Sequence, residues 1–116
     1  MTYLVRYGNK YGAQSTLYKG IAYHSKKEAG FARDLDLLLK ANEIKSWERQ
    51  FKIELRAPSG ELICRYYCDF MVVDKNGQKK LIEIKGFSTE IFRLKLKLLQ
   101  LLWLPQHPEY EYEIIR

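Results

Sequence analysis

Hydrophobic and polar positions follow two different periods along the chain, and these periods predict strands and helices. Residues 15–18 and 21–24 flank Lys19-Gly20, so the first elements expected are the two strands of a short hairpin. Apolar and polar side chains alternate over residues 47–55, which is typical of a strand with one mostly apolar face. Strands are therefore expected on both sides of the stretch that lies between these segments.

That intervening stretch has the period of an amphipathic helix, which begins at Ser25 and runs to about Ala41. Ser25 and Glu28 match the S-x-x-E sequence of a capping box at a helix N-terminus. Because Glu28 precedes apolar residues at helical spacings, we expect its side chain at the end of the buried stripe. The stripe consists of Phe31, Ala32, Leu35, Leu38 and Leu39.

The second half of the chain predicts a meander, a helix and a last strand. Asn76-Gly77 is a strong signal for a tight hairpin turn, and Pro105 and Pro108 end the second helix. The expected elements are strands over residues 61–73, 80–85 and 110–114 and a helix from 90 to about 103. We therefore expect residues 1–116 to form one α/β domain, with a helix, a three-stranded meander, a helix and a strand around a central mixed sheet.

Composition and charge narrow the class of protein. Of the 116 residues, 47% are hydrophobic, which indicates a globular protein rather than a disordered one. Lys and Arg number 20 against 14 Asp and Glu, and the net charge of +6 favours an anionic partner such as nucleic acid. Residues 1–14 form a basic aromatic arm that interleaves tyrosine with arginine and lysine, a composition suited to DNA contact.

The cysteines and the hydropathy predict a cytoplasmic protein. Cys64 and Cys68 lie four positions apart in a predicted strand, about 13 Å, which is too far for a disulfide between them. Two free thiols are typical of a reducing compartment. Residues 1–10 lack the apolar core of a signal peptide. The most apolar stretch, residues 94–104, is shorter than a membrane span and contains lysines, so we expect no membrane partner.

The candidate chemistry lies on the two strands that flank the Asn76 turn. A turn centred on Asn76 places Asp69 opposite Glu83, with their Cβ atoms about 5 Å apart. Two carboxylates at that separation repel each other unless a cation or a proton lies between them. Mg²⁺ prefers such oxygens, and the Ile84 carbonyl is a further expected ligand. Lys85 shares a strand face with Glu83, where its ammonium can stabilise charge on a reacting phosphate.

Each part of this constellation has a structural alternative. Asp69, Glu83 and Lys85 are also compatible with an ordinary hairpin that carries charges on its solvent face. Against that alternative, Asp69 stands within the apolar run 66–73, and Glu83 interrupts a second apolar run, where charge is unexpected. Glu28 can simply complete the capping box, and the sequence leaves that alternative open beside the metal-ligand role.

Basic residues near these elements are the candidate DNA contacts. Lys26 and Lys27 stand at the start of the first helix, and Arg93 and Lys97 are four positions apart on the second. The alternative for the second pair is a solvated helix face. The leucines of the second helix are expected in the core or in a dimer interface; they are Leu94, Leu98, Leu101 and Leu102.

The arrangement resembles the PD-(D/E)XK nuclease superfamily. The chain carries Glu28 on the first helix, then Asp69, and then Glu83-Ile84-Lys85. This is the order of the acids and the lysine in that superfamily. Its restriction-endonuclease-like core is a helix, a three-stranded meander, a helix and a strand. The resemblance covers the chain from residue 25 onward. The proline that names the motif is absent here, because Cys68 precedes Asp69.

A closer resemblance, to small phage nucleases of that superfamily, covers nearly the whole chain. It is carried by Asn9-Lys10-Tyr11-Gly12-Ala13, Tyr18-Lys19-Gly20-Ile21, Ser25-Lys26-Lys27-Glu28-Ala29 and Ile82-Glu83-Ile84-Lys85-Gly86-Phe87. Some relatives of this size are Holliday junction resolvases. The resemblance implies a Mg²⁺ site, in which Mn²⁺ can substitute, made by Glu28, Asp69 and Glu83, with Lys85 as the catalytic lysine. It also implies a phage-encoded homodimer that acts in the bacterial cytoplasm.

The function expected from these features is metal-dependent hydrolysis of phosphodiester bonds in branched DNA, as by a Holliday junction resolvase. One alternative is a nickase or another DNA endonuclease of the same superfamily. The other is a DNA-binding module without catalytic activity. The acid, acid and lysine set argues against the second alternative, because acids near phosphate do not help a protein that only binds DNA.

Overall fold

The computed structural model describes residues 15–86 and 88–116, and the predicted arm over residues 1–14 lies outside them. The chain divides into two compact units, Met1–Glu43 and Ile44–Arg116, which are described separately below. In the described parts of the chain, no helix is both long and apolar enough to cross a membrane.

The first unit begins with the predicted hairpin. Strands β1 (Thr16–Tyr18) and β2 (Ile21–Tyr23) pair antiparallel across a two-residue turn. Both turn residues have positive φ, 52° at Lys19 and 81° at Gly20, as a type I′ turn requires. The tight turn therefore fixes the pairing of the two strands.

Helix α1 (Lys26–Lys40) follows directly and begins at the predicted cap. The Ser25 hydroxyl oxygen accepts a hydrogen bond from the Glu28 backbone N–H at 3.1 Å. The predicted buried stripe is correct as far as Leu35 but wrong at Leu38 and Leu39, which are exposed. Tyr18 joins β1 to the helix by donating a 2.6 Å hydrogen bond to Asp36.

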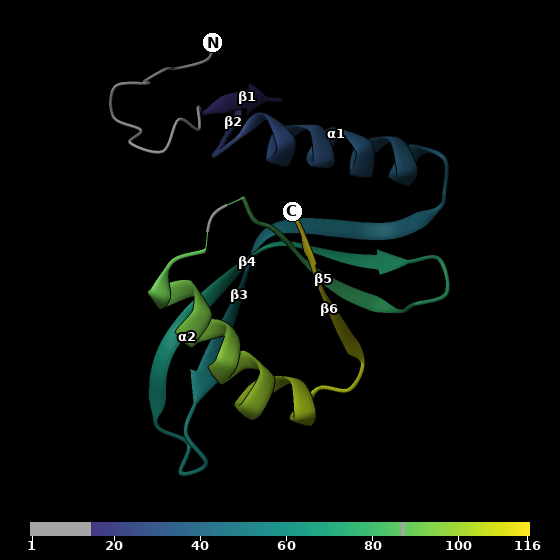
Figure 1. The fold of residues 1–116 in the computed structure, drawn as a ribbon. Helices are drawn as coiled ribbons and strands as arrows, with labels where there is room; N and C mark the ends of the chain where they lie inside the picture. The colour runs from purple at the N-terminus through teal and green to yellow at the C-terminus, as the bar shows by residue number, and fades with distance from the viewer. Residues whose placement is uncertain (1–14, 87) are drawn as a thin grey trace. The chain divides into compact units, whose positions relative to one another are not determined.

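The second unit is built on a mixed four-stranded sheet in the order β3-β4-β5-β6 (Figure 1). Strands β3 (Ile44–Arg56), β4 (Leu62–Asp74) and β5 (Lys79–Ile84) form an antiparallel meander, and β6 (Tyr110–Ile115) pairs parallel with β5. This confirms the predicted α/β class, the meander and the mixed sheet. Strand β3 is longer than its alternating segment 47–55, because it begins at Ile44, whereas β4 and β5 have the predicted lengths.

Both hairpin loops of the meander use a glycine in the left-handed region. Gly60 (φ 97°) and Gly77 (φ 89°) each donate a backbone hydrogen bond to the residue three positions earlier. A three-residue loop that ends in such a glycine sets the strand register. On β4 and β5 the register is Met71 opposite Leu81 and Val73 opposite Lys79, as the Asn76-centred turn predicts.

The connection from β5 to β6 is helical but less regular than expected. Helix α2 spans Glu90–Leu98, and its N-cap Thr89 accepts from the Phe92 N–H at 3.0 Å. A π-helical turn, η2 (Leu99–Trp103), and a 3₁₀ turn, η3 (Leu104–Gln106), then replace the expected α-helix. The wider π turn changes the rotational phase of the following side chains.

The leucines of this connection divide between the core and the surface. Leu99 is fully buried and Leu98 packs against the core, whereas Leu94 and Leu101 are exposed, so for these two the dimer interface stays a prediction. Leu99 joins Phe92 against one face of the sheet, where the core residues include Ile53 and Leu81. That packing fixes α2 over the sheet face on which the site residues lie.

Candidate active site

Three charged side chains are buried among the residues that the structure describes, and all three are acids. Glu28 is 4% exposed, Asp69 7% and Glu83 5%. They are the same three carboxylates that the sequence nominates as metal ligands. Burying a carboxylate is unfavourable unless it gains a partner charge, hydrogen bonds or a proton. The surroundings of each acid therefore determine what it can do.

Asp69 stands where β4 changes the positions that face the core. Before Asp69, the side chains that face the core are at even-numbered positions, namely Cys64, Tyr66 and Cys68. After Asp69 they are at odd-numbered positions, namely Met71 and Val73. Across the sheet, β3 pairs Arg49 with Phe70 and Phe51 with Cys68. Gln50 therefore stands opposite Asp69, and it has a left-handed backbone with φ 50°. The alternation that the sequence shows on each strand is thus interrupted at this one row.

The same row ends the ladder between β4 and β5. The last paired residues are Phe70 and Ile82, and one further step of that register places Asp69 opposite Glu83. Instead of a backbone ladder bond, Asp69 Oδ2 accepts a 2.9 Å hydrogen bond from the Ile84 N–H. This bond holds the Asp69 carboxylate beside β5.

Glu83 is buried at this point and is sensitive to its neighbours. The pKa of Glu83 is raised from 4.5 to about 8, chiefly by burial and next by the adjacent Asp69 carboxylate. The hydrogen bond from Tyr66 and the charge of Lys85 lower the pKa of Glu83. The acid pair therefore holds a proton at neutral pH, or it holds a cation in place of the proton.

Two tyrosines that the sequence did not nominate support Glu83. Tyr66 on β4 donates a 2.7 Å hydrogen bond to Glu83 Oε1, and its hydroxyl lies 2.9 Å from the hydroxyl of Tyr112 on β6. Burial raises the pKa of both tyrosines well above the usual range, so both remain neutral donors. The alternation of β4 predicts the inward side chain of Tyr66, but no sequence signal connects Tyr66 to Glu83.

Lys85 directly follows the last residue of β5, two positions after Glu83. Its ammonium is 4.3 Å from the centroid of the Phe92 ring of α2, a cation–π contact that restricts the lysine side chain. Its backbone N–H donates to Ile115 O at 2.8 Å, which extends the pairing with β6. The structure therefore brings Asp69, Glu83 and Lys85 together at the end of the ladder.

Cys68, which directly precedes Asp69, is a buried structural thiol. Its Sγ donates to Ile82 O at 3.3 Å and lies 3.6 Å from Phe70 O. Burial raises the pKa of Cys68 far above its usual range, so the reactive thiolate is suppressed. Cys64 is half-buried, and both cysteines are free, as expected.

Glu28 belongs to the first unit, where it has a capping role. Its Oε1 accepts from the His24 backbone N–H at 2.9 Å, while its own N–H donates to Ser25. The carboxylate therefore caps the residue before the N-cap. Within the described residues, no three acidic, histidine or cysteine side chains gather closely enough to form a metal site. The role of Glu28 as a ligand thus stays a prediction.

The predicted DNA contacts are all solvent-exposed. Lys26 and Lys27 lie on the first turn of α1, where Lys26 lines a cavity of about 320 Å³ together with Arg33. Arg93 and Lys97 are exposed on α2, and an Arg93 guanidinium nitrogen donates to Ser88 O at 3.2 Å. All four side chains are thus accessible to an anionic ligand.

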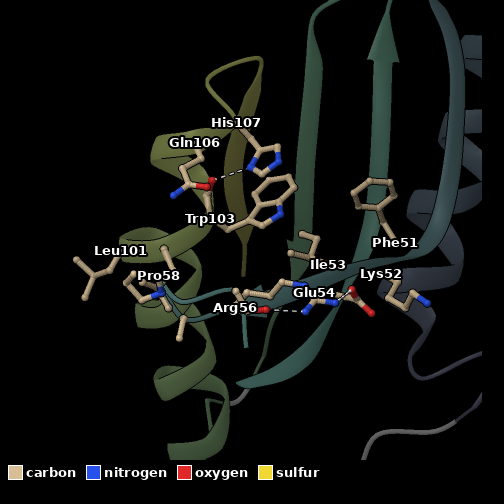
Figure 2. Close-up of a pocket in the computed structure, with 13 residues that line it drawn as sticks. Phe51, Lys52, Ile53, Glu54, Arg56, Pro58, Leu101, Trp103, Gln106 and His107 are labelled. Carbon is tan, nitrogen blue, oxygen red and sulfur yellow. Dashed lines mark hydrogen bonds and ion pairs between the residues drawn. The ribbon is translucent and has the colours of Figure 1, made fainter. Parts of the chain in front are cut away.

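A larger groove, of about 800 Å³, lies between β3 and the turns η2 and η3 (Figure 2). Its wall includes Trp103, whose ring stacks on His107 at a centroid distance of 3.9 Å, and Phe51 of β3. None of the predicted catalytic residues lines this groove. We place the candidate chemistry at the acid pair, because a catalytic site requires the reactive groups as well as space.

One family model matches the chain. It is described as "Protein of unknown function (DUF1064)" and covers residues 8–112, which include all the candidate site residues. No curated protein and no solved structure matches the chain.

Proposed function

The chain belongs to the DUF1064 family, and we propose that it is a Mg²⁺-dependent endonuclease with a restriction-endonuclease-like core that cuts branched DNA. The observation that carries the proposal is the row at the end of the β4-β5 ladder. Two buried acids face each other there, and a lysine stands beside them, two positions after Glu83. The resemblance to small phage nucleases adds the substrate class, a four-way junction, and a homodimeric assembly.

The donor set fits a hard divalent cation. Asp69 and Glu83 supply carboxylate oxygens, and burial together with the Asp69 charge makes the ionised form of Glu83 unfavourable unless a cation binds. The N–H and C=O of a strand residue project to the same edge, so the Ile84 carbonyl lies on the Asp69 side, as its N–H does. The resemblance adds Glu28 to the proposal as a third ligand. When bound, Mg²⁺ supplies the charge that activates water and stabilises the leaving oxygen.

The residues of the chain position these groups before DNA binds. The Ile84 N–H and the Tyr66 hydroxyl hold the carboxylates of Asp69 and Glu83 by one short hydrogen bond each. Lys85, restrained over the Phe92 ring, places its ammonium where charge develops on the phosphate. Preorganised charges of this kind need no rearrangement during the reaction.

DNA contacts in the proposal come from the exposed basic residues and the overall charge. Arg93 and Lys97 on α2, with Lys26 and Lys27 on α1, neutralise phosphates around the cut site. The net charge of +6 favours association with any nucleic acid. Selection of branched DNA then depends on the shape that two copies of the chain present.

The test compares a labelled four-way junction with a linear duplex of matched sequence. Each is incubated with Mg²⁺, with EDTA, and with a Glu83→Ala variant; Glu111→Ala, an exposed acid on β6, is the matched control. The proposal expects paired nicks across the junction that disappear in EDTA and in Glu83→Ala but persist in Glu111→Ala.

Other outcomes distinguish the alternatives. Single nicks, or equal cutting of both substrates, would retain the active site and reject the junction as its substrate. Tight binding without cutting under any divalent metal would show a binding module and overturn the enzymatic proposal.

A further inference from the structure

We propose that Gln50 is a further catalytic residue, whose side-chain amide donates hydrogen bonds to the phosphate at the cut site. The inference rests on the proposed nuclease function. It starts from a residue whose backbone conformation is unfavourable for its type and which occupies the same row as the two buried acids. From the sequence, Gln50 is a residue of the first meander strand that can point into the site, but the alternation of that strand leaves its face open.

The register places Gln50 beside the acid pair. On β3, Arg49 pairs with Phe70 and Phe51 pairs with Cys68, so Gln50 stands opposite Asp69. Since the β4-β5 register places Asp69 opposite Glu83, one row runs from Gln50 through Asp69 to Glu83. Gln50 therefore borders the candidate metal site from the third strand.

The backbone of Gln50 is strained. Its φ of 50° is in the left-handed region, which a residue with a Cβ adopts at a cost and which glycine adopts freely. The conformation accompanies the change in core-facing positions at this row, which requires only the backbone. Glycine would provide that backbone with less strain, so the structural need does not explain a long amide side chain here. Strain of this kind clusters at functional sites.

The Gln50 side chain is available for a ligand. It is half-buried, and within the described residues its carboxamide makes no hydrogen bond or ion pair. A carboxamide offers two N–H donors and carries no charge. Beside two carboxylates it can approach an anionic phosphate without competing for the cation, whereas a third carboxylate there would repel the phosphate. These properties suit a donor to a non-bridging phosphate oxygen.

The test separates chemistry from folding with three substitutions. Gln50→Gly keeps the backbone conformation and removes the amide, and Gln50→Ala removes the amide and keeps the backbone strain. Gln50→Glu keeps the shape of the side chain but replaces the N–H donors with a carboxylate that only accepts hydrogen bonds. Gln106→Ala, an exposed glutamine on η3, is the matched control. The readouts are the single-turnover cleavage rate on a four-way junction, the melting temperature, and its rise when Mg²⁺ is added.

We expect Gln50→Gly and Gln50→Ala to lower the cleavage rate by about 10–100-fold, as loss of a hydrogen bond to a charged group does. Gln50→Gly should also raise the melting temperature by about 2–6 °C, because it relieves strain. The rise in melting temperature on addition of Mg²⁺ should persist in both variants. Gln50→Glu should cleave the junction no faster than Gln50→Ala. A purely structural role would instead make rate and stability change together.

Three results would overturn the assignment. They are a wild-type cleavage rate in Gln50→Gly, full activity in Gln50→Glu, and loss of the Mg²⁺-dependent stabilisation in Gln50→Gly. Failure of the nuclease proposal looks different, because the wild-type protein itself then cuts no substrate with any divalent metal. That result removes the assignment of Gln50 together with the function on which it rests.

Discussion

Glu83→Gln should make the metal-free protein more stable at neutral pH, although it removes a buried side chain that makes a hydrogen bond. Glutamine has the shape of a protonated glutamate, and its carboxamide oxygen can still accept from the Tyr66 hydroxyl. The substitution therefore isolates one property of Glu83, its ionisation at a buried site beside Asp69.

The magnitude follows from linkage between proton binding and folding. The folded-state pKa of Glu83 is raised from 4.5 to about 8 by burial and by Asp69. Between these values the folded protein retains a proton that the unfolded chain releases, so stability falls as pH rises and levels off above the folded pKa. At about 1.36 kcal/mol per pH unit, the unfolding free energy of the wild-type protein falls by on the order of 3 kcal/mol between about pH 5 and pH 7.5. Glu83→Gln lacks this dependence.

The assay is urea unfolding of both proteins at the two pH values, in EDTA and again with saturating Mg²⁺. The difference in unfolding free energy between Glu83→Gln and wild type should grow with pH in EDTA. Mg²⁺ should reverse that growth, because the wild-type carboxylate gains a cation and the variant does not. An equal difference at both pH values would show that Glu83 ionises normally, and the argument for a buried acid pair would fail.

Three further substitutions test the rest of the site. Tyr66→Phe removes the 2.7 Å hydrogen bond to Glu83 and should weaken Mg²⁺ binding about 10-fold, measured as thermal stabilisation against metal concentration. An unchanged affinity for Mg²⁺ would show that Tyr66 contributes only to packing. Lys85→Ala should slow cleavage of a four-way junction by about 100-fold and leave Mg²⁺ stabilisation intact, and a parallel loss of metal binding would contradict a role at the phosphate. Arg93→Ala with Lys97→Ala should weaken binding to junction and duplex alike and reduce the salt slope by about two, whereas an unchanged slope would remove α2 from the DNA interface.

The sequence predicted the parts of the site that depend on local turn chemistry. Asn76-Gly77 sets the loop that fixes the β4-β5 register, and this register alone places Asp69 opposite Glu83. The buried positions of both acids also follow from their apolar neighbours in the chain. Short-range rules were sufficient here because a hairpin is closed by the residues of its own loop.

The features that the sequence missed depend on contacts between distant segments. The left-handed backbone of Gln50 has no local signal, because glycine or asparagine is the usual marker of that conformation. The hydrogen bonds of Tyr66 with Glu83 and Tyr112 join three strands that meet only in the folded sheet. The π turn at Leu99 likewise departs from the regular helix that the leucine spacing predicts.

The row from Gln50 through Asp69 to Glu83 combines three separate costs to folding. Gln50 has a strained backbone, Asp69 ends a backbone ladder, and Glu83 is an acid buried against another acid. A purely structural explanation would need a different reason for each departure, and an apolar row would avoid the burial of both acids. The proposed cation with a bound phosphate would give one reason for all of them, because the acids would hold the cation and the amide would meet the phosphate. The coincidence of these costs in one row is therefore the strongest argument that the sheet was selected here for chemistry rather than for stability.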